Sequence, residues 1–195
     1  SPDSRYVIFL SEKDLFSVDL YIADARRGKI IRKITSSTRD GHLDDLNFIE
    51  SAGTWSPDSE EFAFVAVKKG KNVLVIKNVK NGRTVDEIEI KGVPSFSHPA
   101  WHPKGKRIVV SGLVDGQTDL YEYNFKTKRV TRLTDDAYSE IHPQWSKDGY
   151  KLLYATDELS YDRGRTDGRW TFNIAELEFD GEENIIRKGV FEWFY

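Results

Sequence analysis

Short apolar runs recur along the chain, with polar turn residues between them. The first set reads Val7-Ile8-Phe9, Phe62-Ala63-Phe64, Ile108-Val109-Val110 and Leu152-Leu153-Tyr154. A second set follows at 20–22, 73–76, 120–123 and 172–174, and a third at 30–34, 84–88, 130–133 and 185–186. Runs of this length between turn signals predict buried β-strands, and helical periodicity is weak throughout.

One turn is repeated six residues before each run of the first set. It reads Ser56-Pro57-Asp58-Ser59 after Trp55, His102-Pro103-Lys104-Gly105 after Trp101, Ser146-Lys147-Asp148-Gly149 after Trp145, and Ser1-Pro2-Asp3-Ser4 without a Trp. The starts are 55, 46 and 44 residues apart. Proline fixes φ, Asp and Ser bond nearby N–H groups, and Gly lets the chain reverse, so we interpret the tetrapeptide as structural.

Adding the short segment that ends in each Trp gives four strands per repeat. A four-stranded sheet that recurs about every 45 residues is typical of a β-propeller blade. A generic β-sandwich explains the strands but not the turn that recurs in register with them. We therefore predict an all-β fold of about four consecutive four-stranded blades, with approximate limits 1–35 (lacking its inner strand), 47–90, 95–135 and 139–188, and with 189–195 as a tail or the start of a next element.

Three longer segments carry a resemblance. They are Trp-Ser-Pro-Asp-Ser at 55–59, His-Pro-Ala-Trp-His-Pro-Lys-Gly at 98–105 and His-Pro-Gln-Trp-Ser-Lys-Asp-Gly at 142–149. Together with the Asp-Leu-Tyr of 19–21 and 119–121, they resemble the WD40-like (PD40) repeat of TolB-type propellers over almost the whole chain. Lys104 for the usual Asp and Lys147 for the usual Pro put the geometry of single turns in doubt. Such propellers usually have six blades, or roughly 270 residues, so the resemblance implies a partial propeller cut from a longer chain.

The charge distribution and the absence of known motifs argue against several classes of function. The formal net charge is −3 with both signs interspersed, so no basic stripe is present and nucleic acid is not an expected partner. No apolar run approaches the roughly 20 residues that span a bilayer, so no direct membrane insertion is expected. Cysteine is absent, and the sequence contains no G-x-S-x-G, H-E-x-x-H, P-loop or dinucleotide motif. We predict neither enzymatic activity nor a cofactor.

Two histidines stand at the same place in consecutive repeats. His98 and His142 each precede the repeated turn by four residues. As inner-strand residues near a channel mouth, they are candidates for binding a carboxylate or a metal. The alternative, which we favour, is that a His-Pro pair simply starts the inner strand, because two histidines without a third ligand bind zinc poorly. No metal site is predicted.

Two long connections add further candidates. The segment 40–45 offers carboxylates and an imidazole, which suit Ca²⁺, but it lacks the EF-hand order, and we favour a hydrated acidic loop as its explanation. The insertion 157–169 carries three arginines among acidic residues. A simpler explanation than ligand binding is that the arginines compensate these negative charges. Because the strands are antiparallel, both connections should emerge on the side of the histidines, opposite the tight turns. The candidate ligand-binding residues are His98, His142, Asp40, His42, Asp44, Asp45, Arg163, Arg165 and Arg169.

The resemblance implies a function by binding. TolB-type propellers dock proteins or peptides in the bacterial cell envelope, whereas similar propellers filter substrates in tricorn-like and prolyl-oligopeptidase-like serine peptidases. We favour a non-catalytic protein- or peptide-binding module of the periplasm, with the peptidase-gating propeller as the alternative and a carbohydrate-binding propeller as a third hypothesis. Open edges on the terminal blades also predict self-association.

Overall fold

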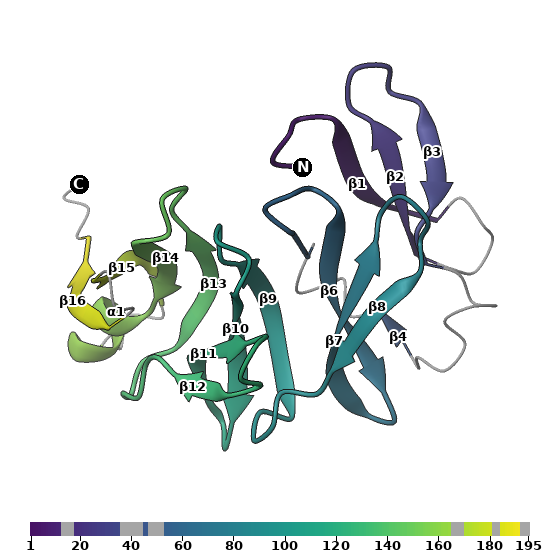
Figure 1. The fold of residues 1–195 in the computed structure, drawn as a ribbon. Coiled ribbons are helices and arrows are strands. Elements are labelled where there is room, and N and C mark those ends of the chain that lie inside the picture. Colours follow the sequence, from purple (N-terminus) through teal and green to yellow (C-terminus); the bar gives the residue numbers. More distant parts are fainter. Residues whose placement is uncertain (13–17, 36–44, 47–52, 165–169, 181–183, 192–195) are drawn as a thin grey trace. The chain divides into compact units, whose positions relative to one another are not determined.

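The computed structural model describes residues 1–12, 18–35, 45–46, 53–164, 170–180 and 184–191. These residues form four antiparallel sheets (Figure 1). The described part contains one helix, α1 (Glu158–Asp162), which is too short to cross a membrane. The chain divides into two compact units, Ser1–Glu89 and Ile90–Tyr195, each with two sheets.

The first unit holds a three-stranded sheet and a sheet with four strand positions. The first sheet has the order β1 (Tyr6–Ser11), β2 (Asp19–Asp24) and β3 (Ile30–Lys33). The second contains β4 (Asp45–Leu46), β5 (Thr54–Trp55), β6 (Glu61–Lys68), β7 (Lys71–Asn78) and β8 (Thr84–Ile88). Both β4 and β5 pair with β6, at its opposite ends, so the two short strands share one edge position.

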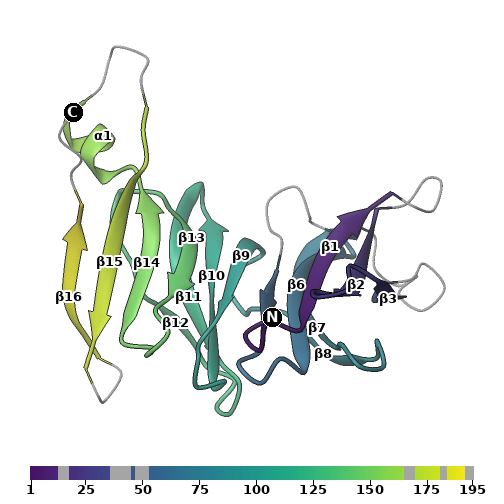
Figure 2. The same ribbon diagram turned by 90° about the horizontal axis from the view of Figure 1, so that it is seen from above.

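The second unit holds two four-stranded sheets. The third sheet contains β9 (Ser95–Trp101), β10 (Arg107–Val114), β11 (Gln117–Asn124) and β12 (Val130–Arg132). The fourth contains β13 (Glu140–Trp145), β14 (Lys151–Thr156), β15 (Asn173–Phe179) and β16 (Ile185–Val190). Helix α1 lies beside the end of β14 and the start of β15, as Figure 2 shows.

Most strands lie where the sequence predicts them, and the all-β expectation is confirmed. The exceptions are β15, which extends to Phe179 beyond the predicted run at 172–174, and β4, which the sequence did not predict. Trp55, Trp101 and Trp145 end β5, β9 and β13. Each unit has a core between its two sheets. In the second unit, the ring of Trp145, in the fourth sheet, lies 4.5 Å from that of His102, which follows β9 of the third sheet, and Trp145 belongs to a cluster that joins the two sheets. This tryptophan therefore packs sheet against sheet, as its place beside the turn suggests.

The repeated turn is held by one serine hydroxyl. Ser56 Oγ donates to Asp58 Oδ1 at 2.6 Å and accepts the N–H of Glu61 at 2.8 Å. Ser146 makes the equivalent bonds to Asp148 and Lys151, at 2.7 and 2.9 Å. The hydroxyl thus closes a loop of five residues, which explains why Ser and Asp recur at this spacing.

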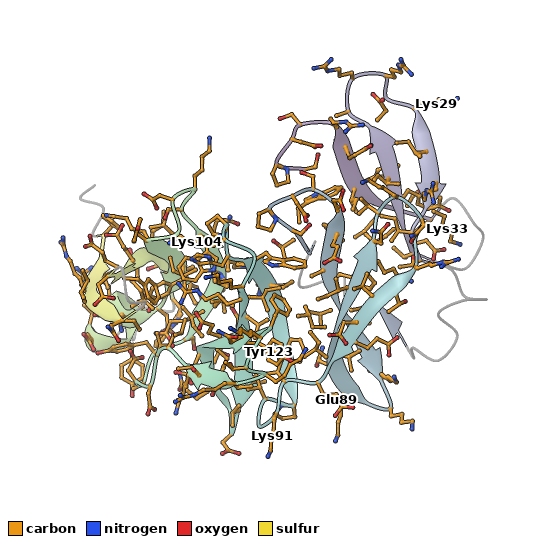
Figure 3. All side chains as sticks on the ribbon, in the orientation of Figure 1. Lys29, Lys33, Glu89, Lys91, Lys104 and Tyr123 are labelled. Carbon is orange, nitrogen blue, oxygen red and sulfur yellow. The ribbon has the colours of Figure 1, made fainter. Side chains whose placement is uncertain are left out.

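His102 takes over this role in the third sheet, where Lys104 replaces the usual Asp. Its Nδ1 accepts the N–H of Lys104 at 3.1 Å. Its Nε2 lies 3.1 Å from the carbonyl oxygen of Gly149 and 3.2 Å from Arg107 Nη2. Lys104 itself is exposed at the tip of the turn (Figure 3). The departure from the family pattern leaves the turn intact and links it to the turn of the fourth sheet.

The repeated Asp-Leu-Tyr also has a structural explanation. In the first sheet, Asp19 accepts the hydroxyl of Thr35 at 2.9 Å and pairs with Lys33 at 2.6 Å (Figure 3). In the third sheet, the equivalent Asp119 pairs with Arg132 at 2.6 Å. Each Asp therefore ties the middle of a sheet to the strand beside it.

Candidate binding surface at the loop end

The connections of the second unit emerge at two ends because its strands are antiparallel. We call the loop end the end that carries residues 115–116, which join β10 to β11, residues 133–139, which join β12 to β13, and residues 157–164 and 170–172 of the β14–β15 connection. We call the turn end the opposite end, which carries the repeated turns at 102–106 and 146–150 and the β11–β12 turn at 125–129.

The loop-end connections are bonded to one another. Asp157 Oδ1 accepts the N–H of Ser139 at 2.7 Å, and Tyr138 Oη donates to Asp162 Oδ1 at 2.9 Å. The side-chain amide of Gln117 donates to the carbonyl of Tyr138. The three connections therefore form one surface rather than three separate loops.

The described part of the β14–β15 insertion is folded, which the sequence did not predict. Trp170 Nε1 donates to Asp157 Oδ2 at 2.9 Å. The fully buried Ser160 hydroxyl donates to the carbonyl of Thr171 at 2.9 Å and accepts its N–H at 3.0 Å. These bonds hold α1 against the segment that enters β15. A five-residue helix of polar residues has no periodicity to detect, so only the tertiary bonds reveal it.

His98 and His142 occupy equivalent β-bulges in β9 and β13. Their φ angles are +50° and +56°, a region that non-glycine residues seldom adopt. Pairing of β9 with β10 and of β13 with β14 shifts register at these positions. A bulge changes the direction of the side chain of the extra residue, so the same backbone feature orients both imidazoles. The repeat spacing in the sequence correctly predicted that the two residues occupy equivalent positions.

The two imidazoles face each other. Their ring centroids are 3.8 Å apart, and the ring planes cross at 51°. His98 Nδ1 lies 2.8 Å from Ser97 Oγ, and His98 is half-buried whereas His142 is exposed. Burial, with a smaller effect from His142, lowers the pKa of His98 to about 4. At neutral pH His98 therefore offers hydrogen bonds and a lone pair rather than a positive charge.

A buried carboxyl group lies two residues before His142. Glu140 is fully buried, and neither of its carboxyl oxygens has a hydrogen-bond partner in the described part of the chain. Burial is the main reason that the pKa of Glu140 rises to about 8, so the group is mostly protonated at neutral pH. The nearby Tyr154 hydroxyl is also buried without a partner, and its pKa is raised by the same cause. No sequence signal distinguishes Glu140 from an exposed strand residue.

Lys188 bridges two carboxylates, from the β12–β13 connection and from α1. Lys188 Nζ lies 2.6 Å from Asp136 Oδ2 and 3.3 Å from Glu158 Oε2. The lysine thereby connects β16 to the β12–β13 connection and to α1. Because its two partners come from different elements, Lys188 helps to fix the arrangement of the loop end.

The other predicted site residues have different positions. Asp40, His42, Asp44, Arg165 and Arg169 lie outside the described residues. Asp45 begins β4, in the first unit, and Arg163 follows α1 as an exposed residue of the loop end. The structure thus brings together His98 and His142. Within the described ranges, no three or more His, Cys, Asp or Glu side chains gather to hold a metal.

Comparison with known sequences points to one family. The family model described as the TolB beta propeller domain matches residues 46–162. The Tol-Pal system protein TolB of Ruthia magnifica subsp. Calyptogena magnifica is 29% identical over 142 residues, which cover 69% of this chain and 33% of that protein. An uncharacterized protein of Agrobacterium fabrum is 26% identical over 183 residues, covering 92% of this chain and 57% of that protein. The chain therefore spans about a third to just over half the length of these relatives.

Solved structures show the same fold. The crystal structure of TolB from Acinetobacter baumannii is similar over 97% of this chain and 41% of that chain, with a TM-score of 0.71 and 20% identity. A prolyl endopeptidase structure is similar over 96% of this chain and 28% of that chain, with a TM-score of 0.63 and 18% identity. At these identities the likeness concerns the fold alone. Since the family model covers more than half of the residues and the repeats and sheets agree with it, the chain belongs to the TolB beta propeller domain family, and its four sheets are blades of that fold.

Proposed function

We propose that the chain is a non-catalytic propeller module that binds a protein or peptide in the bacterial periplasm, within a Tol-Pal-type system. Membership of the TolB beta propeller domain family and similarity to a Tol-Pal system protein support this proposal. The whole relatives are longer than this chain, so the proposal concerns the part of such a protein that these residues form.

The observation that carries the proposal is the surface at the loop end. His98 and His142 face each other from neighbouring blades, and the β14–β15 insertion exposes half of the Tyr161 and Trp170 side chains. Neutral imidazoles hydrogen-bond to peptide groups, and amphipathic aromatic rings supply contact area with little loss of side-chain entropy. A polar peptide segment therefore matches the chemistry of this surface better than a strongly charged ligand.

The other candidate residues are proposed independently of that surface. We propose Asp40, His42, Asp44 and Asp45 in the first unit, and Arg163, Arg165 and Arg169 in the second unit, as ligand-binding residues, and we propose the four blade limits given above. No cofactor is required for binding of this kind. A peptidase-gating role is not favoured, because the similarity to a prolyl endopeptidase extends only to the fold.

The proposal is tested by measuring binding to the purified soluble domains of Tol-Pal system proteins by calorimetry. We expect at least one domain to bind, and replacing both His98 and His142 by Asn to weaken that binding at least about tenfold, or about 1.4 kcal/mol. Asn tolerates positive φ and so keeps the bulges. Lys104→Ala, at the turn end, is the matched control and should leave the affinity unchanged. Absence of any binding domain, or loss of binding in the control alone, would contradict the proposal.

Self-association is also part of the proposal. Leu153 and Ile174 are 38% and 44% exposed on one face of the fourth sheet. In the third sheet, the equivalent Val109 and Leu120 are fully buried in the core shared with the fourth sheet. The fourth sheet thus presents a face of the kind that packs against another blade, and a second copy can cover it. Sedimentation should show oligomers that Ile174→Lys reduces; a monomer at all concentrations would contradict this.

A further inference from the structure

A groove lies between the first and second sheets, both of which belong to the first unit. It has a volume of about 160 Å³ and is lined by Tyr6, Ile22, Ile31, Arg32, Val79 and Lys80. Ile22 and Val79 are buried in the core that these two sheets share, and Tyr6 packs against that core. We propose that the groove binds the C-terminal residue of a peptide, with the apolar side chain of that residue in the groove and its carboxylate on Arg32.

The equivalent position in the second unit is filled by two large side chains. Arg107 takes the place of Tyr6, since both stand five residues after the start of a repeated turn. The guanidinium carbon of Arg107 lies 5.1 Å from the ring centroid of Trp145 and 5.6 Å from that of Phe179. Arg107 also pairs with Glu122 at 3.1 Å. The space between the third and fourth sheets is therefore occupied at this position.

A smaller residue leaves this space open in the first unit. Val79 is the equivalent of Phe179, because the N–H of each donates to the residue that follows a repeated turn, Glu60 or Tyr150. Valine lacks the ring that fills the corresponding space in the second unit. An apolar cavity of about 150 Å³ holds a benzene ring. The groove is therefore large enough for one aromatic or branched side chain.

The wall of the groove is apolar and aromatic. Ile31 is the extra residue of a bulge in β3, where the pairing with β2 shifts register, and its side chain is 45% exposed. The ring of Tyr6 is held by stacking on Trp55, with centroids 6.4 Å apart. A side chain that enters beside Val79 and these two residues removes their apolar surface from water, which favours binding.

The rim of the groove carries two positive charges. Arg32 pairs with Ile22 across β2 and β3, and cross-strand partners lie on the same face of a sheet, so the guanidinium stands beside the apolar wall. Lys80 Nζ is bonded to Glu60. Arg32 is exposed and has no ion-pair partner within the described ranges. A guanidinium in this position matches a carboxylate, which it can bind through two parallel hydrogen bonds.

These two requirements define the ligand. In a peptide, an apolar side chain and a carboxylate meet on one residue at the C-terminus, and capture of that end is a known mode of peptide recognition. A free carboxylic acid with an apolar group shares this chemistry, so the test must separate the two. The groove belongs to the first unit and the paired histidines to the second, so this proposal and the proposed function can fail independently.

The test is NMR titration of the 195-residue chain with the tripeptide Ala-Ala-Phe, as the free acid and as the C-terminal amide. We expect the acid to shift the amide signals of residues 6, 22, 31–32 and 79–80. It should bind at least about tenfold more tightly than the amide, because bidentate guanidinium–carboxylate bonds are strong. Arg32→Gln should remove this preference. Arg27→Gln, exposed in the β2–β3 turn, is the matched control and should leave it unchanged.

Two further arms test the shape of the site and the source of the ligand. Val79→Phe supplies the ring that Phe179 provides in the second unit, so we expect it to abolish binding. The compound 3-phenylpropionate carries the ring and the carboxylate without the preceding peptide groups, and we expect it to bind more weakly than the tripeptide acid.

Several results would overturn the proposal. They are the absence of saturable shifts at the groove, equal binding of acid and amide, a preference for the acid that survives Arg32→Gln or is lost equally in Arg27→Gln, and binding retained in a folded Val79→Phe variant. Binding of 3-phenylpropionate as tight as that of the tripeptide would assign the groove to small acids instead. If Val79→Phe unfolds, the comparison of acid and amide on the wild type decides. Shifts at 98 and 142 in place of the groove would also exclude this site.

Discussion

The two ends of the second unit are built on different principles. At the turn end, each repeated turn is closed by bonds from one side chain, and His102 and Gly149 join two turns across neighbouring blades. At the loop end, a carboxyl group is buried without a partner, and the two histidines hold uncommon backbone angles. The turn end also holds a buried polar atom without a partner in the described part of the chain, Trp145 Nε1, and a non-glycine residue with positive φ, Lys128. The two ends therefore differ in how their connections are held: by bonds within each turn at the turn end, and by bonds between connections at the loop end.

Gly149→Ala should give the largest effect, because it removes the space on which the turn end depends. A Cβ at this position would lie 2.7 Å from His102 Nε2, and the φ of +79° disfavours any L side chain. We expect a loss of roughly 2–4 kcal/mol in unfolding free energy, measured by urea denaturation. Gly116→Ala, in open space at the loop end with φ +85°, is the matched control for the backbone strain alone. An equal loss in both variants would show that contact with His102 contributes nothing.

Glu140→Gln should show how much stability is lost when the buried carboxyl group at the loop end ionises. The folded pKa of Glu140 is raised to about 8, above the ordinary value of 4.5. Its neutral form is therefore favoured in the fold, and the stability that it contributes below pH 4.5 is lost as the pH rises through 8. The variant does not ionise, so its stability relative to the wild type should increase between pH 5 and 8, by on the order of 2 kcal/mol. A pH-independent difference would contradict the buried, unpartnered carboxyl group.

Much of the turn end could be predicted from sequence, and little of the loop end. Turn chemistry and strand alternation are local, so Ser146, Asp148 and the tryptophans that end the inner strands were identified directly. The bond from His102 to Gly149 joins residues 47 apart, and no local sequence signal predicts it. Burial of Glu140 and the docking of α1 depend on which elements meet in three dimensions. The equivalent positions of His98 and His142 in β9 and β13 could be predicted, because the register repeats.

Asp157→Ala should loosen the loop end alone. The carboxylate accepts the N–H of Ser139 and that of Trp170 Nε1. Losing two bonds to a charged acceptor should cost about 1–2 kcal/mol. Hydrogen exchange should rise at 138–139 and 157–164 but not at the turn end. Asp148→Ala, which removes an acceptor at the turn end, should give the opposite distribution. Faster exchange at both ends in either variant would show that the two ends are not independent.

His98→Asn should have the smallest effect on stability. The folded pKa of His98 is about 4, below the ordinary 6.5, so the stability contributed by its neutral form is present above pH 6.5 and lost as the pH falls towards 4. Asn does not titrate, and we expect the variant to gain about 1 kcal/mol over the wild type between pH 7 and 5. His42→Asn is the comparison. A constant difference across this range would mean that His98 is not desolvated.

The central claim is that a partner binds at the loop end and that the turn end only supports the fold. The most direct measurement is the footprint of a bound Tol-Pal-type partner on the chain, by amide NMR shifts or protection from hydrogen exchange. We predict changes at 97–98, 133–142 and 157–164, and none at 102–106, 125–129 or 146–150. A footprint centred on those three turns, with the histidine pair unaffected, would contradict the account.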